Sequence, residues 1–193
     1  MILVLFSSCG TVHLHHFGNK IIVGNKKLTE PVEVYYVHKK NLITPEKNPY
    51  FCNVSDVRKA FANSENYLKE KSLKRNIILS DHPLLTYTLE LVEQKYEETV
   101  TKVEIFDNEK NSIGYYDEYH VKFYVYGILS INNKKQRVSA TYKFTSSPRQ
   151  SFWFKSEIIN KPSFVNEKRV VENLMNKFSN KLYQYINSAE GNS

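Results

Sequence analysis

The chain has 193 residues, of which 41% are hydrophobic and 24% charged, an ordinary composition for one folded globular domain. Its 14 tyrosines and 11 phenylalanines against 6 glycines favour a fold rich in sheet, because these rings suit a half-buried pleated surface. The net charge of +7 favours anionic partners, and no apolar run reaches the roughly 18–20 residues that a membrane-spanning helix needs.

Residues 1–6 form an unbroken apolar run, which Ser7, Ser8, Cys9 and Gly10 follow. This order resembles the end of a bacterial lipoprotein signal peptide, in which the cysteine is acylated and becomes the new N-terminus. Cys9 is therefore the predicted lipidation site, since its thiol can take a diacylglyceryl group as a thioether. Gly10 in place of an aspartate implies, by resemblance to the sorting rule of such lipoproteins, the periplasmic side of the outer membrane of a Gram-negative bacterium.

Residues 10–30 are predicted to form a tether and a first short strand, and they carry His13, His15 and His16. Imidazoles at positions i and i+2 of a strand could share a metal ion, but no acidic ligand lies close to them in the sequence. We therefore predict a solvated tether and no metal site. The other predicted boundaries are a signal-peptide remnant over 1–9, one α+β domain over 31–187 and a frayed tail over 188–193.

The first part of the domain is predicted to alternate strand, helix and strand. β-branched and aromatic residues over 31–38 predict a strand, and a helix is predicted to begin at Ser55 and Asp56 and to end near 71–76. The apolar face of this helix repeats at steps of three and four residues: Val57, Ala60, Phe61, Ser64 and Leu68. Strict alternation over 85–91 predicts a strand with one wet face, which a polar ribbon extends through a bulge.

The second part is predicted to hold a hairpin and a closing helix. Alternation over 119–126 and over 137–144, with a turn at 131–134, predicts two antiparallel strands. From Asn166 onward the sequence predicts an amphipathic helix with the apolar stripe Val171, Leu174, Met175, Phe178, Leu182 and Ile186. The predicted fold class is α+β: an antiparallel sheet of about four to five strands with two helices packed on one face.

Cations and tyrosines share the predicted outer face of the hairpin. This face is expected to present His120, Lys122, Tyr124, Tyr126, Arg137, Ser139, Thr141 and Lys143. We take Lys122, Tyr124, Tyr126, Arg137 and Lys143 as the candidate face for an anionic ligand, because cations between aromatic rings suit phosphorylated sugars, an acidic protein or a single-stranded nucleic acid. An ordinary solvated face of a basic protein is the alternative.

No pattern of catalytic or cofactor-binding residues emerges from the sequence. The glycines build no GxGxxG or GxxxxGK[ST] loop, and neither GxSxG nor HExxH occurs. His82 and His120 are isolated, and Asp117 and Glu118 are adjacent carboxylates near the start of a strand. Acylation of Cys9 would leave Cys52 as an unpaired thiol. We predict no catalytic residues, no cofactor and no enzymatic activity.

With these motifs the chain resembles the lipopolysaccharide-assembly lipoprotein (LptE) family. The resemblance lies in Ser7-Ser8-Cys9-Gly10 and, over 84–187, in T-Y-T-L-E-L, Y-Y-D-E-Y-H-V-K-F-Y-V-Y, R-V-S-A-T-Y-K-F and the closing helix. It implies two helices on a four-stranded sheet, a seat inside an outer-membrane barrel and basic residues that touch the glycolipid. Auxiliary lipoproteins of ABC-transport complexes have a similar order of elements. The resemblance transfers no individual site residue.

Three functions stay open at this point. The favoured one is a non-enzymatic, lipid-anchored periplasmic accessory in outer-membrane lipid or lipopolysaccharide assembly or transport. Its partners would be the membrane, an outer-membrane barrel or an ABC-transport complex, and lipopolysaccharide or phospholipid. The first alternative is a basic domain that binds single-stranded nucleic acid, a ligand that a membrane-tethered periplasmic domain is not expected to meet. The second is a small enzyme that uses the thiol of Cys52.

Overall fold

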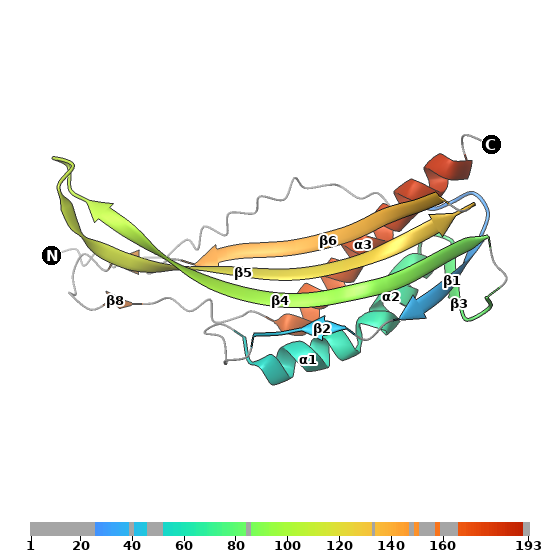
Figure 1. Cartoon of the computed structure of the whole chain (residues 1–193), viewed down its shortest axis with the longest axis horizontal. Coiled ribbons are helices and arrows are strands. Elements are labelled where there is room, and N and C mark those ends of the chain that lie inside the picture. The colour runs from blue at the N-terminus through green and yellow to red at the C-terminus, as the bar shows by residue number, and fades with distance from the viewer. Residues whose placement is uncertain are drawn as a thin grey trace, which may run out of the picture.

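A long, curved sheet covered on one face by helices forms the body of the protein in this computed structural model (Figure 1). The structure describes residues 26–38, 41–45, 52–83, 86–132, 134–146, 149–150, 157–158 and 166–190. Cys9 and the histidines at 13, 15 and 16 lie outside these ranges. Of the predicted tether and first strand over 10–30, residues 26–30 are described, and they contain no strand, although Leu28 is buried.

The sheet has the strand order β3-β1-β4-β5-β6, and β2 pairs with β4 beside this path. Its strands are β1 (Val32–His38), β2 (Leu42–Ile43), β3 (Ile77–Ser80), β4 (Tyr87–Phe106), β5 (Ser112–Ile131) and β6 (Lys134–Ser146). A separate pair is formed by β7 (Arg149–Gln150) and β8 (Glu157–Ile158).

The α+β class is confirmed, but the prediction of a purely antiparallel sheet is wrong because the sheet is mixed. β5 is antiparallel to both of its neighbours, β4 and β6, whereas β1 runs parallel to both β3 and β4, and β2 runs parallel to β4. The helical segment between β1 and β3 is a crossover that brings the chain back in the same direction, which a parallel pair requires. Alternation of side chains does not encode this direction, since it is the same in both kinds of pairing.

Three helices cover one face of the sheet, where two were predicted (Figure 1). α1 (Val54–Ala62) and α2 (Ser64–Leu73) divide the predicted first helix at Asn63, and α3 (Glu167–Glu190) is the closing helix. The Asn53 side chain caps α1 by accepting a hydrogen bond from the Ser55 backbone N–H at 2.7 Å. The helix therefore begins one residue before the predicted Ser55, and α3 continues three residues past 187.

The core lies between these helices and the sheet. Alternate residues of β5, among them Val121, Phe123 and Val125, are fully buried against Leu174, Phe178 and other residues of the α3 stripe. Where α3 crosses β5, Gly127 leaves space for the close approach. A Cβ at this position would lie 2.8 Å from the Glu90 carbonyl oxygen and 3.1 Å from the Phe178 ring.

The hairpin of β4 and β5 extends well beyond the helices (Figure 1). We call residues 99–118 the arm; they comprise the ends of the two strands and the turn between them. The arm is a two-stranded ribbon, because the pairing of β6 with β5 stops at Tyr119. The turn is fixed by Asp107, whose carboxylate accepts hydrogen bonds from the backbone N–H groups of Glu109 and Asn111 at 2.9 and 2.8 Å. In the described part of the chain, no helix is long and apolar enough to cross a membrane.

Candidate anion-binding face

The sheet face opposite the helices brings the five predicted residues together on two neighbouring strands. Lys122, Tyr124 and Tyr126 alternate on β5 with residues buried in the core, so their side chains stand on the outer face. Arg137 and Lys143 stand on the same face of β6, and Lys143 is directly opposite Lys122 in the register. None of the three helices lies over this face (Figure 1).

Arg137 is held by two tyrosines of β5. Its guanidinium lies 4.4 Å from the centre of the Tyr126 ring, and its Nη2 donates a hydrogen bond to the Tyr124 hydroxyl at 2.8 Å. The hydrogen bond with Tyr124 raises the pKa of Arg137 above its ordinary value, and Glu93 of β4 adds to this effect. A guanidinium that is already oriented loses less side-chain entropy when an anion binds it.

Lys122 and Lys143 form a second basic position. The Lys122 ammonium lies 5.2 Å from the centre of the Tyr124 ring and 3.0 Å from the Glu97 carboxylate of β4. Glu97 also pairs with Lys95. The hydrogen bond from Lys95 and, to a smaller extent, the one from Lys122 lower the pKa of Glu97. Lys143 is exposed, and no acidic partner faces it among the described residues.

The two basic positions are joined by Tyr124, which contacts Arg137 through its hydroxyl and Lys122 through its ring. Arg137 and Lys143 are six residues apart on β6, a separation of about 20 Å along a strand. They can therefore contact two separate phosphate groups of one large ligand.

Sequence reasoning missed the carboxylates on this face. Beyond the bulge between Leu91 and Glu93, β4 places Glu93 opposite Tyr126 and Glu97 opposite Lys122. On this face β4 thus presents two carboxylates with Lys95 between them, whereas β6 presents cations alone. The alternation of 85–91 could not be extended to these glutamates, because a bulge reverses which residues face outward.

The thiol of Cys52 is a buried group without the features of a nucleophile. It is 1% exposed, and burial raises its pKa to about 12, with smaller contributions from the Glu167 and Glu98 carboxylates. Tyr96, which shares this site, donates its hydroxyl to Glu98 at 2.8 Å. At neutral pH the thiolate is therefore almost absent, and this arrangement does not support the thiol-enzyme hypothesis.

The histidines and paired carboxylates noted in the sequence do not form a common site. Asp117 and Glu118 are adjacent on β5 and so point to opposite faces. His120 pairs with Glu118 at 3.1 Å across the surface, and His82 is exposed. Among the described residues, no cluster of three or more histidine, cysteine or acidic side chains could hold a metal ion.

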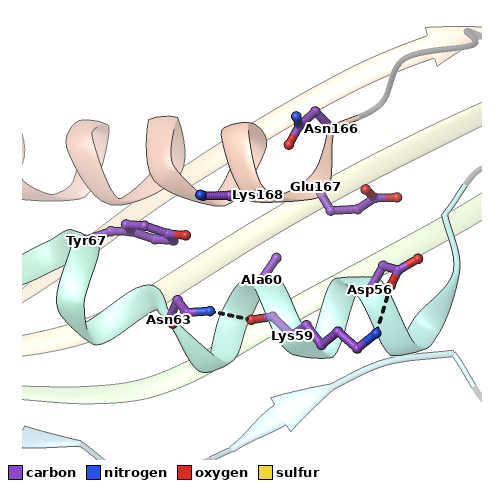
Figure 2. Close-up of a pocket in the computed structure, with 8 residues that line it drawn as sticks. All are labelled: Asp56, Lys59, Ala60, Asn63, Tyr67, Asn166, Glu167 and Lys168. Atoms are coloured by element: carbon purple, nitrogen blue, oxygen red, sulfur yellow. Dashed lines mark hydrogen bonds and ion pairs between the residues drawn. The ribbon is translucent and has the colours of Figure 1, made fainter.

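A groove with a volume of about 360 Å³ lies between α1 and the start of α3 (Figure 2). It is lined by Asp56, Lys59, Ala60, Asn63, Tyr67, Asn166, Glu167 and Lys168. Lys59 pairs with Asp56 at 3.4 Å, and the Asn63 amide donates to the Lys59 carbonyl at 3.1 Å. Acids and cations alternate around this groove, so it favours no charge of ligand.

A small polar cluster lies between β1 and α2. The Tyr36 hydroxyl and the His38 Nε2 are buried and have no hydrogen-bond partner within the described structure. The other ring nitrogen of His38 lies 3.4 Å from the Glu65 carboxylate, and Gln94 donates to the Ser64 hydroxyl at 2.5 Å. Burial raises the pKa of Tyr36, and Glu65 adds to the shift.

Comparisons with known proteins yield structural likenesses alone. No family model and no curated protein matches the chain. Rare lipoprotein B from Shewanella oneidensis is similar with a TM-score of 0.46 and 11% identity, over 83% of this chain and 97% of that one. A homologue of a neuraminyllactose-binding hemagglutinin from Helicobacter pylori has a TM-score of 0.48 and 9% identity, over 88% and 92%.

A minor lipoprotein from Acinetobacter baumannii has a TM-score of 0.30 and 12% identity, over 83% of this chain and 96% of that chain. Two of these three structures are thus bacterial lipoproteins. With identities near 10% and TM-scores below 0.5, the likenesses support no conclusion about what this chain does. The resemblance to the lipopolysaccharide-assembly lipoprotein family stays a prediction from the sequence.

Proposed function

We propose that this chain is a non-enzymatic, lipid-anchored accessory of the bacterial envelope that binds a phosphorylated lipid during outer-membrane lipid or lipopolysaccharide assembly or transport. Acylation at Cys9 would hold it on the periplasmic side of the outer membrane. The observation that carries the proposal is the uncovered face of β5 and β6, on which Arg137 is oriented by Tyr124 and Tyr126.

The spacing on this face favours a large ligand with more than one phosphate. The backbone positions of Arg137 and Lys143 are about 20 Å apart. Between them, Tyr124 contacts both Arg137 and Lys122. Phosphorylated glycolipids carry phosphates on a broad sugar headgroup, whereas a single inorganic phosphate would use half of the face. Hydrogen bonds between charged groups contribute about 1.5–3 kcal/mol each, so each position could account for an affinity factor of roughly 10 to 100.

The geometry favours a lipid phosphate over single-stranded nucleic acid. Proteins that bind single strands without sequence preference stack bases on exposed aromatic rings. Here Lys122 lies over the Tyr124 ring and Arg137 lies over the Tyr126 ring, so one face of each ring is already covered by a cation. The tyrosines orient the cations, which suits phosphate binding more than base stacking.

The test measures binding of purified lipopolysaccharide to the full chain by calorimetry. Arg137→Gln and Lys143→Gln are each expected to weaken binding at least fivefold, and the double variant by about the product, because distant sites act independently. Lipopolysaccharide with one phosphate removed should bind the wild-type chain more weakly and lose sensitivity to one of the two variants.

Lys59→Gln is the matched control. Its ammonium is exposed on α1, on the helical side, and its removal changes the net charge equally. Equal losses in Lys59→Gln and Arg137→Gln would reduce the effect to net charge and contradict a site on this face. Tighter binding of a single-stranded oligonucleotide than of lipopolysaccharide at physiological salt would favour the nucleic-acid alternative.

A further inference from the structure

The arm carries apolar side chains that nothing in the described structure covers. Val100, Phe106, Ile113 and Tyr115 are each more than half exposed. By strand alternation, Val100 and Tyr115 continue the row that is buried further along the hairpin as Tyr96 and Val121. The core-facing surface of the sheet thus runs on past the helices that cover it (Figure 1).

The arm also has its own charge. Residues 99–118 hold five carboxylates against two lysines, a net charge of −3 in a chain whose total is +7. The carboxylates belong to Glu104, Asp107, Glu109, Asp117 and Glu118. A surface that is both apolar and acidic fits a partner with apolar side chains beside basic ones.

The same chain presents such a surface along β6 and α3. β6 contains four cations and no acid, which gives it a charge of +4. On its helical face Tyr142 is half-buried, and the Lys177 ammonium of α3 lies 5.4 Å from the centre of its ring. Lys181 is exposed one turn further along α3. We call Tyr142, Lys143, Lys177 and Lys181 the basic flank.

Two strand edges accompany these charges. Within the described residues, the 112–118 segment of β5 pairs with β4 alone, and β6 pairs with β5 alone. Each edge therefore has a row of backbone N–H and C=O groups able to take another strand. One edge lies in the acidic arm and the other in the basic strand.

From this arrangement we propose that two copies of the chain form a closed dimer in which the arm of each copy lies along the basic flank of the other. A twofold axis makes the contact reciprocal, so each copy gives one arm and receives one, and both the arm edge of β5 and the edge of β6 are paired. Val100 and Tyr115 of the arm then cover the half-buried ring of Tyr142 on the partner.

The charges favour contact between arm and flank over contact between two β6 edges, between two arms, or between an arm and a membrane. Two β6 edges would bring four cations against four cations, and two arms would bring acid against acid, so neither pairs with itself. A bilayer with anionic headgroups would repel the carboxylates of the arm. The contact is made twice in the dimer, which helps it to reach the roughly 1,200–2,000 Å² that a stable interface buries.

The test is sedimentation equilibrium of the full chain carrying Cys9→Ser, so that acylation and membranes play no part. The reference chain is expected to be a dimer at micromolar concentration in 50 mM NaCl and to dissociate at least tenfold more readily in 500 mM NaCl, where screening is stronger. A chain that stays monomeric up to about 100 µM in 50 mM NaCl overturns the proposal.

A charge exchange identifies the surfaces. The arm variant, Glu104→Lys with Asp117→Lys, and the flank variant, Lys177→Glu with Lys181→Glu, should each be monomeric, because like charges then meet in both contacts. An equimolar mixture of the two should restore the dimer, since each arm then faces a flank of opposite charge. Failure of the mixture to associate would overturn the proposal even if both single variants were monomeric.

Control variants separate these effects from unfolding and from net charge. Glu30→Lys with Glu33→Lys changes the charge as the arm variant does, and Lys59→Glu with Lys168→Glu matches the flank variant. All four are exposed positions away from both surfaces. The controls should dimerise like the reference chain, and circular dichroism should give all variants the same folded spectrum. Dimers lost equally in the controls would contradict the assigned surfaces.

Discussion

At the scale of single residues, the buried tyrosines differ in whether their hydroxyls are satisfied. The Tyr36 hydroxyl is buried without a hydrogen-bond partner, whereas the Tyr96 hydroxyl donates to Glu98 at 2.8 Å. An unsatisfied buried hydroxyl costs about 1–3 kcal/mol, and a satisfied one contributes about 1 kcal/mol. Tyr36→Phe is therefore expected to raise the free energy of unfolding by about 1 kcal/mol and Tyr96→Phe to lower it, as measured in urea. A loss of stability in Tyr36→Phe would mean that the hydroxyl has a partner.

The thiol of Cys52 gives a second prediction at this scale. Its pKa is about 12 because it is buried, and a thiol in the unfolded chain has a pKa near 9. Between these values the unfolded chain releases a proton that the folded chain keeps, so stability is complete below pH 9 and falls as the pH rises toward 12. In a Cys9→Ser background, this decline between pH 8 and pH 10 should be smaller in Cys52→Ala than in the parent.

The reactivity of the Cys52 thiol tests its burial directly. Cys52 in the native Cys9→Ser chain should react with a thiol reagent at pH 8 at least a hundred times more slowly than in 8 M urea, since the thiolate is rare and enclosed. Rapid labelling of the native chain would show an accessible thiolate and revive the thiol-enzyme hypothesis.

At the scale of elements, the arm should be dispensable for folding. Its exposed side chains make no contact with the core of the described structure, and β6 ends where the arm begins. Replacing residues 101–118 by Asn-Gly would close β4 and β5 as a tight hairpin between Val100 and Tyr119, which already pair. The free energy of unfolding should change by about 1 kcal/mol or less, while dimerisation should be lost. A loss of several kcal/mol would show that the arm is part of the core.

The elements also show where sequence reasoning succeeds. The hairpin of β5 and β6 follows from alternation and a turn signal that lie next to each other in the chain, so its register and both faces could be predicted. The stripe of α3 was equally clear. The parallel pairing of β1 could not be predicted. Its partner strands β3 and β4 are separated from it in the sequence by α1 and α2, and no local sequence pattern identifies them as partners. The break at Asn63 is hidden because the apolar steps continue across it.

The candidate anion-binding face was likewise predictable only where it depends on local sequence patterns. The residues on β5 and β6 were found because both strands alternate strictly. Glu93 and Glu97 were missed because a bulge on β4 decides which of its residues point outward. The orienting contacts of Arg137 with Tyr126 and Tyr124 join side chains two and four register positions apart, which alternation alone does not connect.

At the scale of the whole molecule, charge is unevenly distributed. The arm has a charge of −3, so the remainder of the chain has +10 against a total of +7. One end therefore repels anionic ligands while the face of β5 and β6 attracts them. The two proposals share Lys143, so they are distinguished by variants at the residues they do not share: Arg137→Gln for the lipid-binding face, and the substitutions at Glu104, Asp117, Lys177 and Lys181 for the dimer.

The last prediction concerns where the protein is located in the cell, which depends on acylation of Cys9. Each buried methylene contributes about 0.8 kcal/mol to anchoring, so a single acyl chain binds a membrane reversibly, whereas two or more hold it firmly. In a Gram-negative host the mature chain is expected to begin at Cys9, to carry acyl groups detected by mass spectrometry and to sediment with outer membranes. Cys9→Ser should keep residues 1–8 and leave the acylated fraction. A wild-type chain with a free thiol at Cys9 and Met1 still attached would contradict the lipid anchor. The dimer proposal would be unaffected, because its charge-exchange test uses the Cys9→Ser chain.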